Sequence, residues 1–269
     1  MANLLLHSLK EFDEVIFEIA ERQELSGVLE IGSETGVFSE RLHECCAQRG
    51  VKLVTIDPAP AEALVELAKQ SDTLHLVVGY SIPHLQEFGT DANLVLIDGD
   101  HNYYTVYNEL ELIRAAWRAD DRAGVILLHD VGFPTADRDS YYDPETIPEG
   151  SRHPNSFDHG VTLGSNALIQ GGFRGEGVFA WALEAGGPKN GVLTAVKDFV
   201  AQHPEYSYRS LDAVFGLGAL TLTGSATDEI VRDVFARYDN ALIRRLEQNR
   251  LELYLKVIEL QDLLAARAT

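Results

Sequence analysis

Five short apolar runs recur between residues 27 and 129, with a helix-like pattern between each pair. The runs are nearly continuous rather than alternating, which predicts strands that are covered on both faces of a sheet. Strands that alternate with helices predict a mostly parallel, doubly wound α/β sheet, which binds ligands at the carboxyl ends of its strands. The expected strands are 27–31, 51–56, 73–78, 93–97 and 124–129, and the expected helices between them are 36–49, 60–70, 82–88 and 102–118.

The flanking segments complete a seven-stranded, Rossmann-like sheet. A helix is expected over residues 4–24 and another over 189–202, because both segments have apolar residues at helical spacing. Two further strands are expected near 206–211 and 213–222, separated by a tight turn around Asp212, and they form an antiparallel hairpin at the sheet edge. We therefore expect an N-terminal helix in residues 1–24 and one domain over residues 25–222.

Residues 131–187 break this alternation. Pro, Gly, Asp, Tyr and Ser are frequent there, as in SYYDPETIPEGSRHPNSFDHG, and no periodicity is clear. A long segment of this kind inside a compact domain is either mobile or functional. We interpret residues 132–187 as an insertion that serves as a lid or as a substrate-binding region.

The C-terminal segment, residues 225–269, has one long helical pattern over 227–267. Ser225 and Asp228 resemble a capping box ahead of this helix. About 40 helical residues would span about 60 Å at 1.5 Å per residue, which exceeds the width of such a domain. The helix must therefore bend, break near Gln248 and Asn249, or pack against a partner. We expect a homodimer or a higher homo-oligomer through this helix, and the alternative is a helix folded back on its own domain.

The net charge argues against two classes of partner, and the cysteines indicate the redox compartment. The formal net charge of −20 argues against binding to nucleic acid or to an anionic membrane, since both require basic surface. No apolar run reaches the length of a membrane span, and the N-terminus lacks the pattern of a secretory leader. The adjacent Cys45 and Cys46 are expected to be free thiols on a helix, as in a reducing cytoplasm.

A glycine-rich turn follows the first expected strand. Gly32 and Gly36 lie between that strand and the next helix, where backbone N–H groups and the helix N-terminus face a ligand. Asp57 ends the second strand, where a carboxylate accepts both hydroxyls of a ribose. NAD and S-adenosylmethionine sites share this geometry. The G-x-x-x-G spacing and the acidic Glu30 ahead of the turn favour the cationic S-adenosylmethionine over a pyrophosphate.

Titratable residues gather where the fourth and fifth strands end. Asp98, Asp100 and His101 follow the fourth strand, and His129 and Asp130 end the fifth. Neighbouring parallel strands bring their carboxyl ends to one edge, so the two groups are expected to converge there. Two adjacent carboxylates repel each other unless a cation lies between them or one keeps its proton, and Mg²⁺ suits oxygen ligands of this kind. His129 is either a further ligand or a core histidine, and Asp100 or Asn102 is expected to cap the following helix.

Four segments carry a family resemblance. They are VLEIGSETGVFS, VTIDP, LVLIDGDHNYYTVYNELELI and AGVILLHDV. They resemble the class I S-adenosylmethionine-dependent methyltransferases over residues 25–135. More narrowly, they are similar to the group that includes macrocin-type sugar O-methyltransferases, cephalosporin-hydroxylase-like proteins and catechol O-methyltransferase.

The resemblance implies a role for each motif. His101 stands where the sugar enzymes have their general base, and Asp98 and Asp130 stand where the metal-dependent members bind Mg²⁺. His129 stands where those enzymes place a carboxylate, and Glu34 where a glycine is frequent, which are the two departures from the pattern. We include His129 with Asp98 and Asp130 in the expected metal site. The expected cofactor contacts are Glu30, Gly32, Ser33, Gly36, Asp57, Pro58, Tyr80, Ser81 and Asp98.

The expected activity is Mg²⁺-assisted transfer of a methyl group from S-adenosylmethionine to a hydroxyl of a small molecule, such as a sugar, a phenol or a natural-product scaffold. His101 would take the hydroxyl proton as the general base. N-methylation of an acceptor stays open. Two alternatives remain at this point: an NAD-dependent oxidoreductase, and a non-catalytic methyltransferase-like binding subunit.

Overall fold

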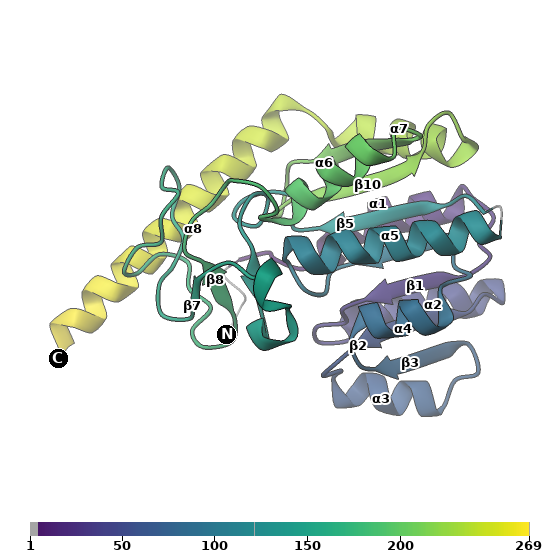
Figure 1. Ribbon diagram of the computed structural model, residues 1–269, viewed down its shortest axis with the longest axis horizontal. Coiled ribbons are helices and arrows are strands. Elements are labelled where there is room, and N and C mark those ends of the chain that lie inside the picture. Colours follow the sequence, from purple (N-terminus) through teal and green to yellow (C-terminus); the bar gives the residue numbers. More distant parts are fainter. Residues whose placement is uncertain (1–4, 121, 269) are drawn as a thin grey trace.

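The computed structural model describes residues 5–120 and 122–268, and a seven-stranded sheet lies at its centre (Figure 1). The strand order is β3-β2-β1-β4-β5-β10-β9, in which β1 to β5 are parallel and β10 is antiparallel to both of its neighbours. The mostly parallel sheet with an antiparallel edge hairpin is therefore confirmed. Its strands are β1 (Val28–Ile31), β2 (Leu53–Asp57), β3 (Leu74–Val78), β4 (Leu94–Ile97), β5 (Val125–His129), β9 (Tyr206–Leu211) and β10 (Leu217–Leu222).

Helices cover both faces of the sheet, because successive strand residues point to opposite sides. Leu94 and Leu96 of β4 pack under α1, α2, α3 and α7, whereas Val95 and Ile97 pack under α4, α5 and α6. This double burial explains why the strands read as continuous apolar runs. The helices are α1 (Asp13–Glu21), α2 (Val37–Arg49), α3 (Glu62–Lys69), α4 (Ser81–Phe88), α5 (Tyr103–Ala119), α6 (Val192–Gln202), α7 (Ala226–Tyr238) and α8 (Ala241–Ala268).

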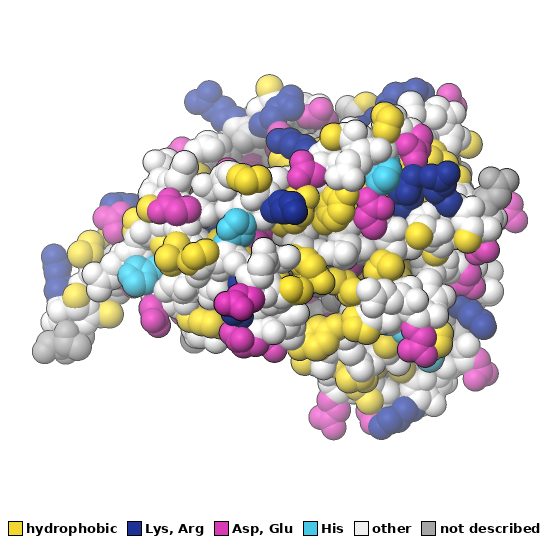
Figure 2. Space-filling model, viewed as in Figure 1, with side chains coloured by type: hydrophobic (Ala, Val, Ile, Leu, Met, Phe, Trp, Pro, Cys, Tyr) yellow, Lys and Arg dark blue, Asp and Glu magenta, His cyan; other side chains and the backbone are white. Residues whose placement is uncertain are grey.

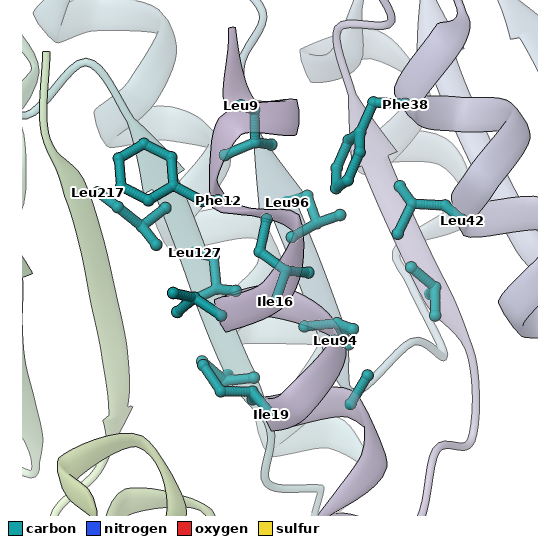
Figure 3. Packing of buried hydrophobic residues seen from close by; sticks show 14 of the residues in the cluster. Leu9, Phe12, Ile16, Ile19, Phe38, Leu42, Leu94, Leu96, Leu127 and Leu217 are labelled. Atoms are coloured by element: carbon teal, nitrogen blue, oxygen red, sulfur yellow. The ribbon is translucent and has the colours of Figure 1, made fainter. Parts of the chain in front are cut away.

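The N-terminal segment closes one of these faces. A 3₁₀ turn, η1 (Leu9–Phe12), leads into α1, and Figure 3 shows Phe12, Ile16 and Ile19 directed at the leucines of β4 and β5. The expected helix over 4–24 is thus shorter, and residue 4 lies outside the described residues. Ser8 ends it on the N-terminal side, since its side chain accepts a hydrogen bond from the Lys10 N–H at 3.5 Å.

The insertion is folded rather than irregular. It contains a small sheet of order β6-β8-β7, formed by β6 (Ser140–Tyr141), β7 (Asn155–Ser156) and β8 (Ala180–Ala182), with the 3₁₀ turns η2 (Pro144–Thr146) and η3 (Glu149–Ser151). Figure 1 shows it between the carboxyl edge of the main sheet and α8.

A buried carboxylate, Asp139, attaches the insertion to the main domain. Its Oδ1 accepts hydrogen bonds from the N–H of Tyr103 at 2.7 Å and of Gly191 at 2.6 Å, which are the residues where α5 and α6 begin. Its Oδ2 accepts a bond from the Tyr141 hydroxyl at 2.7 Å. One side chain therefore joins the first strand of the insertion to two helices of the main domain.

The C-terminal segment differs from the expectation. The helix is interrupted at Asp239 and Asn240, not near Gln248 and Asn249. As a result α7 packs on the sheet, whereas α8 extends away from it. The Asn240 side chain accepts hydrogen bonds from the N–H groups of Leu242 and Ile243, which begins α8 as a new helix. At the other end of α7, the Ser225 side chain caps the helix as expected.

The edge hairpin also differs in detail, because β10 begins at Leu217 rather than at 213. Residues 212–216 form its loop, in which Val214 and Phe215 have positive φ angles. This loop reaches back over the end of β5. None of the described helices is long and apolar enough to cross a membrane.

We predict that Asp139→Ala loosens the insertion while the sheet stays folded. The change leaves two buried N–H groups without an acceptor, at a cost on the order of 2–4 kcal/mol. Hydrogen exchange should become faster in residues 132–187 and stay unchanged in β1, β4 and β5. The exposed Asp158→Ala in the same insertion is the matched control, and equal exchange in both variants would contradict the prediction.

Candidate functional site

The turn after β1 lies directly against the turn after β4. Gly32 has a φ of +87°, and a Cβ at this residue would lie 2.2 Å from the Asp98 carbonyl oxygen. Only glycine fits both requirements. Gly36, with a φ of +79°, is the residue just before α2 and has no side chain to cap the helix. The N–H groups in the first turn of α2 therefore have no side-chain acceptor at the capping position.

Asp57 ties this turn to β2. Its Oδ2 accepts hydrogen bonds at 2.7 Å from both the N–H and the hydroxyl of Ser33, and its Oδ1 accepts one at 2.7 Å from the N–H of Ala59. Each carboxylate oxygen has two lone pairs, so the group keeps acceptor capacity for a ligand. The second-strand acid and the glycine turn are therefore together, as the sequence predicted.

Glu30 is buried in the middle of β1. The Thr55 hydroxyl donates to its Oε2 at 2.8 Å. Burial raises the pKa of Glu30 to about 7, and the charges of Asp98 and Asp57 reinforce this shift. The nearby hydroxyls of Ser39 and Thr55 oppose it. A carboxyl group with this pKa is partly protonated near neutral pH, and a cation placed beside it would favour its charged form.

The other expected cofactor residues surround the same edge. Tyr80 is half exposed and Pro58 is exposed, at the ends of β3 and β2. The Gly79 N–H donates to the Asp57 carbonyl at 3.0 Å, which holds these two ends together. Ser81 is buried, and its hydroxyl donates to Glu109 on α5.

Four side chains meet at the ends of β4 and β5. The Nε2 atom of His101 lies 3.3 Å from Asp98 Oδ1 and 2.9 Å from Asp130 Oδ2. The Nδ1 atom of His129 lies 3.1 Å from the same Asp98 oxygen and 3.2 Å from the same Asp130 oxygen. The expected convergence of the two strand ends is therefore present in the structure. The backbone of Asp130 has a φ of +61°, a conformation that residues other than glycine rarely adopt.

Strong electrostatic coupling follows from this arrangement. Burial alone lowers the pKa of His101, but the carboxylates of Asp130 and Asp98 outweigh it and raise this pKa to about 10. Burial lowers the pKa of His129 as well, but the same two carboxylates outweigh this effect and raise its pKa well above the ordinary value. Although burial raises the pKa of each carboxyl, the two histidines hold the pKa values of Asp98 and Asp130 below the usual range.

The hydrogen bond of His129 to the edge hairpin defines its tautomer. Its Nε2 lies 2.8 Å from the carbonyl oxygen of Val214, which only accepts, so Nε2 carries the proton. Its Nδ1, directed at two carboxylates, therefore carries a second proton or presents a lone pair to a cation. One ligand atom each from Asp98, His129 and Asp130 lies within 4.8 Å of the others. Two carboxylates and an oriented imidazole nitrogen are a donor set that fits a divalent cation.

An aromatic chain begins beside His101. The ring of Tyr142 in the insertion lies 6.0 Å from the His101 ring and 6.0 Å from that of Phe179. Tyr142 also lines an open cleft of about 570 Å³, together with Phe157, Arg152 and His153. Tyr142 and Phe157 lie in the segment SYYDPETIPEGSRHPNSFDHG of the insertion, whereas Phe179 lies beyond it and was not identified from the sequence.

One buried acid behind this edge, Glu109, was not predicted as a site residue. Burial raises the pKa of Glu109 to about 8, opposed by the Ser81 hydroxyl and reinforced by Asp100. The signal in the sequence was a carboxyl group on the apolar face of helix 103–119, between Val106 and Leu110. Asn102, rather than Asp100, caps this helix by accepting from the Thr105 N–H at 2.8 Å.

Part of the chain is similar to known proteins. Residues 29–131 match the family model described as a methyltransferase domain. No curated protein sequence matches this chain. Two similar solved structures are TomG, an O-methyltransferase of Streptomyces achromogenes involved in tomaymycin synthesis, in complex with SAM, and the SAH-bound methyltransferase PaMTH1 of Podospora anserina. TomG is 15% identical, with 82% of each chain covered and a TM-score of 0.48. PaMTH1 is 16% identical, with 80% of this chain and 79% of that chain covered and a TM-score of 0.48.

We predict that Glu30→Gln stabilises the protein above pH 7 more than at pH 5. Glu30 has a folded pKa of about 7 against an ordinary 4.5, so folding keeps a proton that the unfolded chain loses between these values. The free energy of unfolding therefore falls over this interval, by on the order of 3 kcal/mol. Urea unfolding at pH 5 and pH 8 measures the difference. The exposed Glu40→Gln is the control, and a gain independent of pH would refute the assignment.

Proposed function

We propose that the methyltransferase domain over residues 29–131 takes its methyl group from S-adenosylmethionine and transfers it to a hydroxyl oxygen of a small molecule. The observation that supports this most is the contact between the glycine turn and the end of β4. It joins a nucleoside-type site at Asp57 to the four titratable groups at the ends of β4 and β5. We further propose that the chain is one of the metal-assisted O-methyltransferases of the macrocin and catechol type.

In this proposal the cofactor lies along the carboxyl ends of β1, β2 and β3. Asp57 accepts hydrogen bonds from the ribose hydroxyls, and the uncapped N-terminus of α2 faces the cofactor carboxylate. Glu30 and Asp98 provide negative charge for the ammonium and sulfonium groups. Tyr80 and Pro58 contact the adenine ring from the ends of β3 and β2, and the Ser81 hydroxyl lies at its edge.

A divalent cation fits the same proposal. Asp98, Asp130 and Nδ1 of His129 would hold it, because the hydrogen bond to Val214 leaves that nitrogen free of its proton when a cation is present. The two carboxylates suit Mg²⁺, and the imidazole nitrogen also suits Mn²⁺ or Zn²⁺. When bound, the ion supplies Lewis acidity that lowers the pKa of the acceptor hydroxyl.

His101 is the proposed general base. Beside two uncompensated carboxylates it keeps its proton at neutral pH, since their charge raises its pKa to about 10. Positive charge between Asp98 and Asp130 offsets this effect and brings the His101 pKa towards neutrality. His101 then takes the hydroxyl proton, the acceptor oxygen forms a bond to the methyl carbon, and the carbon–sulfur bond breaks to release S-adenosylhomocysteine.

The acceptor is proposed to lie against Tyr142. This ring contacts His101 on one side and lines the cleft of the insertion on the other, so it connects the reacting oxygen with room for the rest of the molecule. Aromatic and polar groups both line that cleft, which suits a sugar or a natural-product scaffold that carries hydroxyl groups.

We predict that the protein binds S-adenosylhomocysteine and does not bind NAD. Asp57→Ala should weaken S-adenosylhomocysteine binding by about 10- to 100-fold, because the hydrogen bonds from the ribose hydroxyls to a charged acceptor are lost. Isothermal titration calorimetry measures both ligands, and thermal unfolding checks that the variant folds. The exposed Asp72→Ala is the control. Preferential binding of NAD would instead support an oxidoreductase, and binding of neither would support a non-catalytic subunit.

We predict separate roles for His101 and Asp130. His101→Gln should slow the transfer of labelled methyl groups to a panel of catechols and glycosylated phenols by about 100-fold or more, because the proton acceptor is lost. Its binding of S-adenosylhomocysteine, and of Mn²⁺ followed by electron paramagnetic resonance, should be retained. Asp130→Asn should lose Mn²⁺ binding as well as turnover. Full turnover by His101→Gln would exclude it as the base.

A further inference from the structure

The helix α8 has two apolar faces, and only one of them packs on its own domain. Leu251 on the inner face is buried with Phe215 and Leu5. Glu247 accepts a hydrogen bond from the Phe215 N–H at 3.2 Å, and Asp262 accepts two bonds of 2.8 Å from the Arg174 guanidinium of the insertion. This face therefore has its partners within the chain.

The opposite side of α8 carries exposed aliphatic side chains, and six of them form a straight row, which we call the α8 stripe. Its members are between 39% and 65% exposed in the structure. They are Leu242, Leu246, Leu253, Val257, Leu260 and Leu264. An α-helix turns about 100° per residue, so these six side chains lie within about 60° of one another and extend over about 33 Å. Part of α8 projects beyond the body of the molecule, and hydrophobic side chains are visible along that end (Figure 1, Figure 2).

The width of the stripe identifies the kind of surface that it fits. A helix that packs on a sheet or lies in a membrane interface presents an apolar face of 100° or more, whereas a narrow straight row is typical of a helix-to-helix seam. The α8 stripe is narrow over residues 242–260, and the apolar face widens only at its C-terminal end, where the exposed Leu263 lies about 60° from Leu260 on the charged flank. Another helix of similar length is therefore the best match for it.

The charged residues beside the stripe lie at nearly equal distances on the two sides of its centre, with a positive residue on one side matched by a negative residue on the other. Along one flank the exposed residues Arg245, Glu252, Lys256 and Glu259 alternate in sign. When the helix is reversed, this order places each positive residue opposite a negative one. The pairs Arg245–Glu259 and Glu252–Lys256 are each centred within one residue of Leu253, which is also the midpoint of the stripe.

We propose that α8 pairs with α8 of a second copy of this chain, antiparallel and around a twofold axis near Leu253. In an antiparallel pair the same flank of both helices meets, so Arg245 faces Glu259 of the other copy and Glu252 faces its Lys256. A parallel pair would place this charged flank beside the other flank of its partner, which has no such series. The interface is isologous, as in most homodimers.

The first test is the mass of the full chain in solution. Sedimentation or light scattering at micromolar concentration should give twice 29.7 kDa. Leu253→Glu should raise the dimer dissociation constant by about 100-fold or more, since it buries an unpaired carboxylate in the seam. Ala265→Glu adds the same charge at an exposed position of α8 away from the stripe and its charged flank, and it should have no effect. A monomer at all concentrations, or a dimer unaffected by Leu253→Glu, would overturn the proposal.

Charge reversal tests the direction of the pair. Arg245→Glu and Glu259→Arg should each weaken the dimer, and the double variant should restore it, because the two residues face each other across the seam. The absence of this rescue would overturn the proposed register.

Disulfide trapping tests the axis in a Cys45→Ser background. Leu253→Cys should cross-link to itself, whereas Leu242→Cys and Leu264→Cys should not, because in an antiparallel pair they lie far from their own copies. Cross-linking at all three positions would indicate a parallel pair. A monomer that binds vesicles of phosphatidylcholine and phosphatidylserine through the stripe would indicate a lipid surface. Both results would reject an antiparallel dimer.

Discussion

The contact between Gly32 and the Asp98 carbonyl is the constraint on which the site depends. Strand β1 lies between β2 and β4, so the short turn that follows it touches both neighbours. Ser33 of this turn binds Asp57 on one side, and Gly32 lies against the residue that ends β4 on the other. Asp57 and the acidic rim are therefore held at a fixed separation by two adjacent residues. A side chain at Gly32 would push these two halves apart.

The acidic character of this edge has a consistent physical meaning. Glu30 lies within β1, and Asp57, Asp98 and Asp130 lie at the carboxyl ends of the neighbouring strands β2, β4 and β5. Glu30 and Asp57 are buried and the other two are partly buried, so water screens their charges poorly. The structure answers this charge in three different ways: with hydroxyl and N–H donors at Asp57, with a raised pKa at Glu30, and with two imidazoles at the rim. Each answer leaves room for added positive charge, which is what a sulfonium cofactor and a divalent cation bring.

Much of this architecture was predictable because it depends on local sequence. The continuous apolar runs predicted buried parallel strands, and side-chain caps such as Asn102 and Ser225 lie one residue before their helices. The interruption of the helix at Asn240 was not predictable from apolar spacing, since apolar residues continue at helical intervals on both sides of it. The order in the insertion depends on Asp139, whose acceptors bind N–H groups at two distant helix starts. Long-range hydrogen bonds of this kind leave no periodic signal.

The bond from His129 to Val214 has a further consequence for how the site is assembled. Every proposed ligand lies within residues 98–130, yet the acceptor that orients His129 is in the loop before β10, 85 residues later. β10 pairs with β5 only after the insertion and α6 have been synthesised. During translation the nascent chain thus carries the proposed metal ligands before the acceptor that orients His129 has been synthesised. The orientation of His129 is therefore complete only when the edge hairpin has joined the sheet.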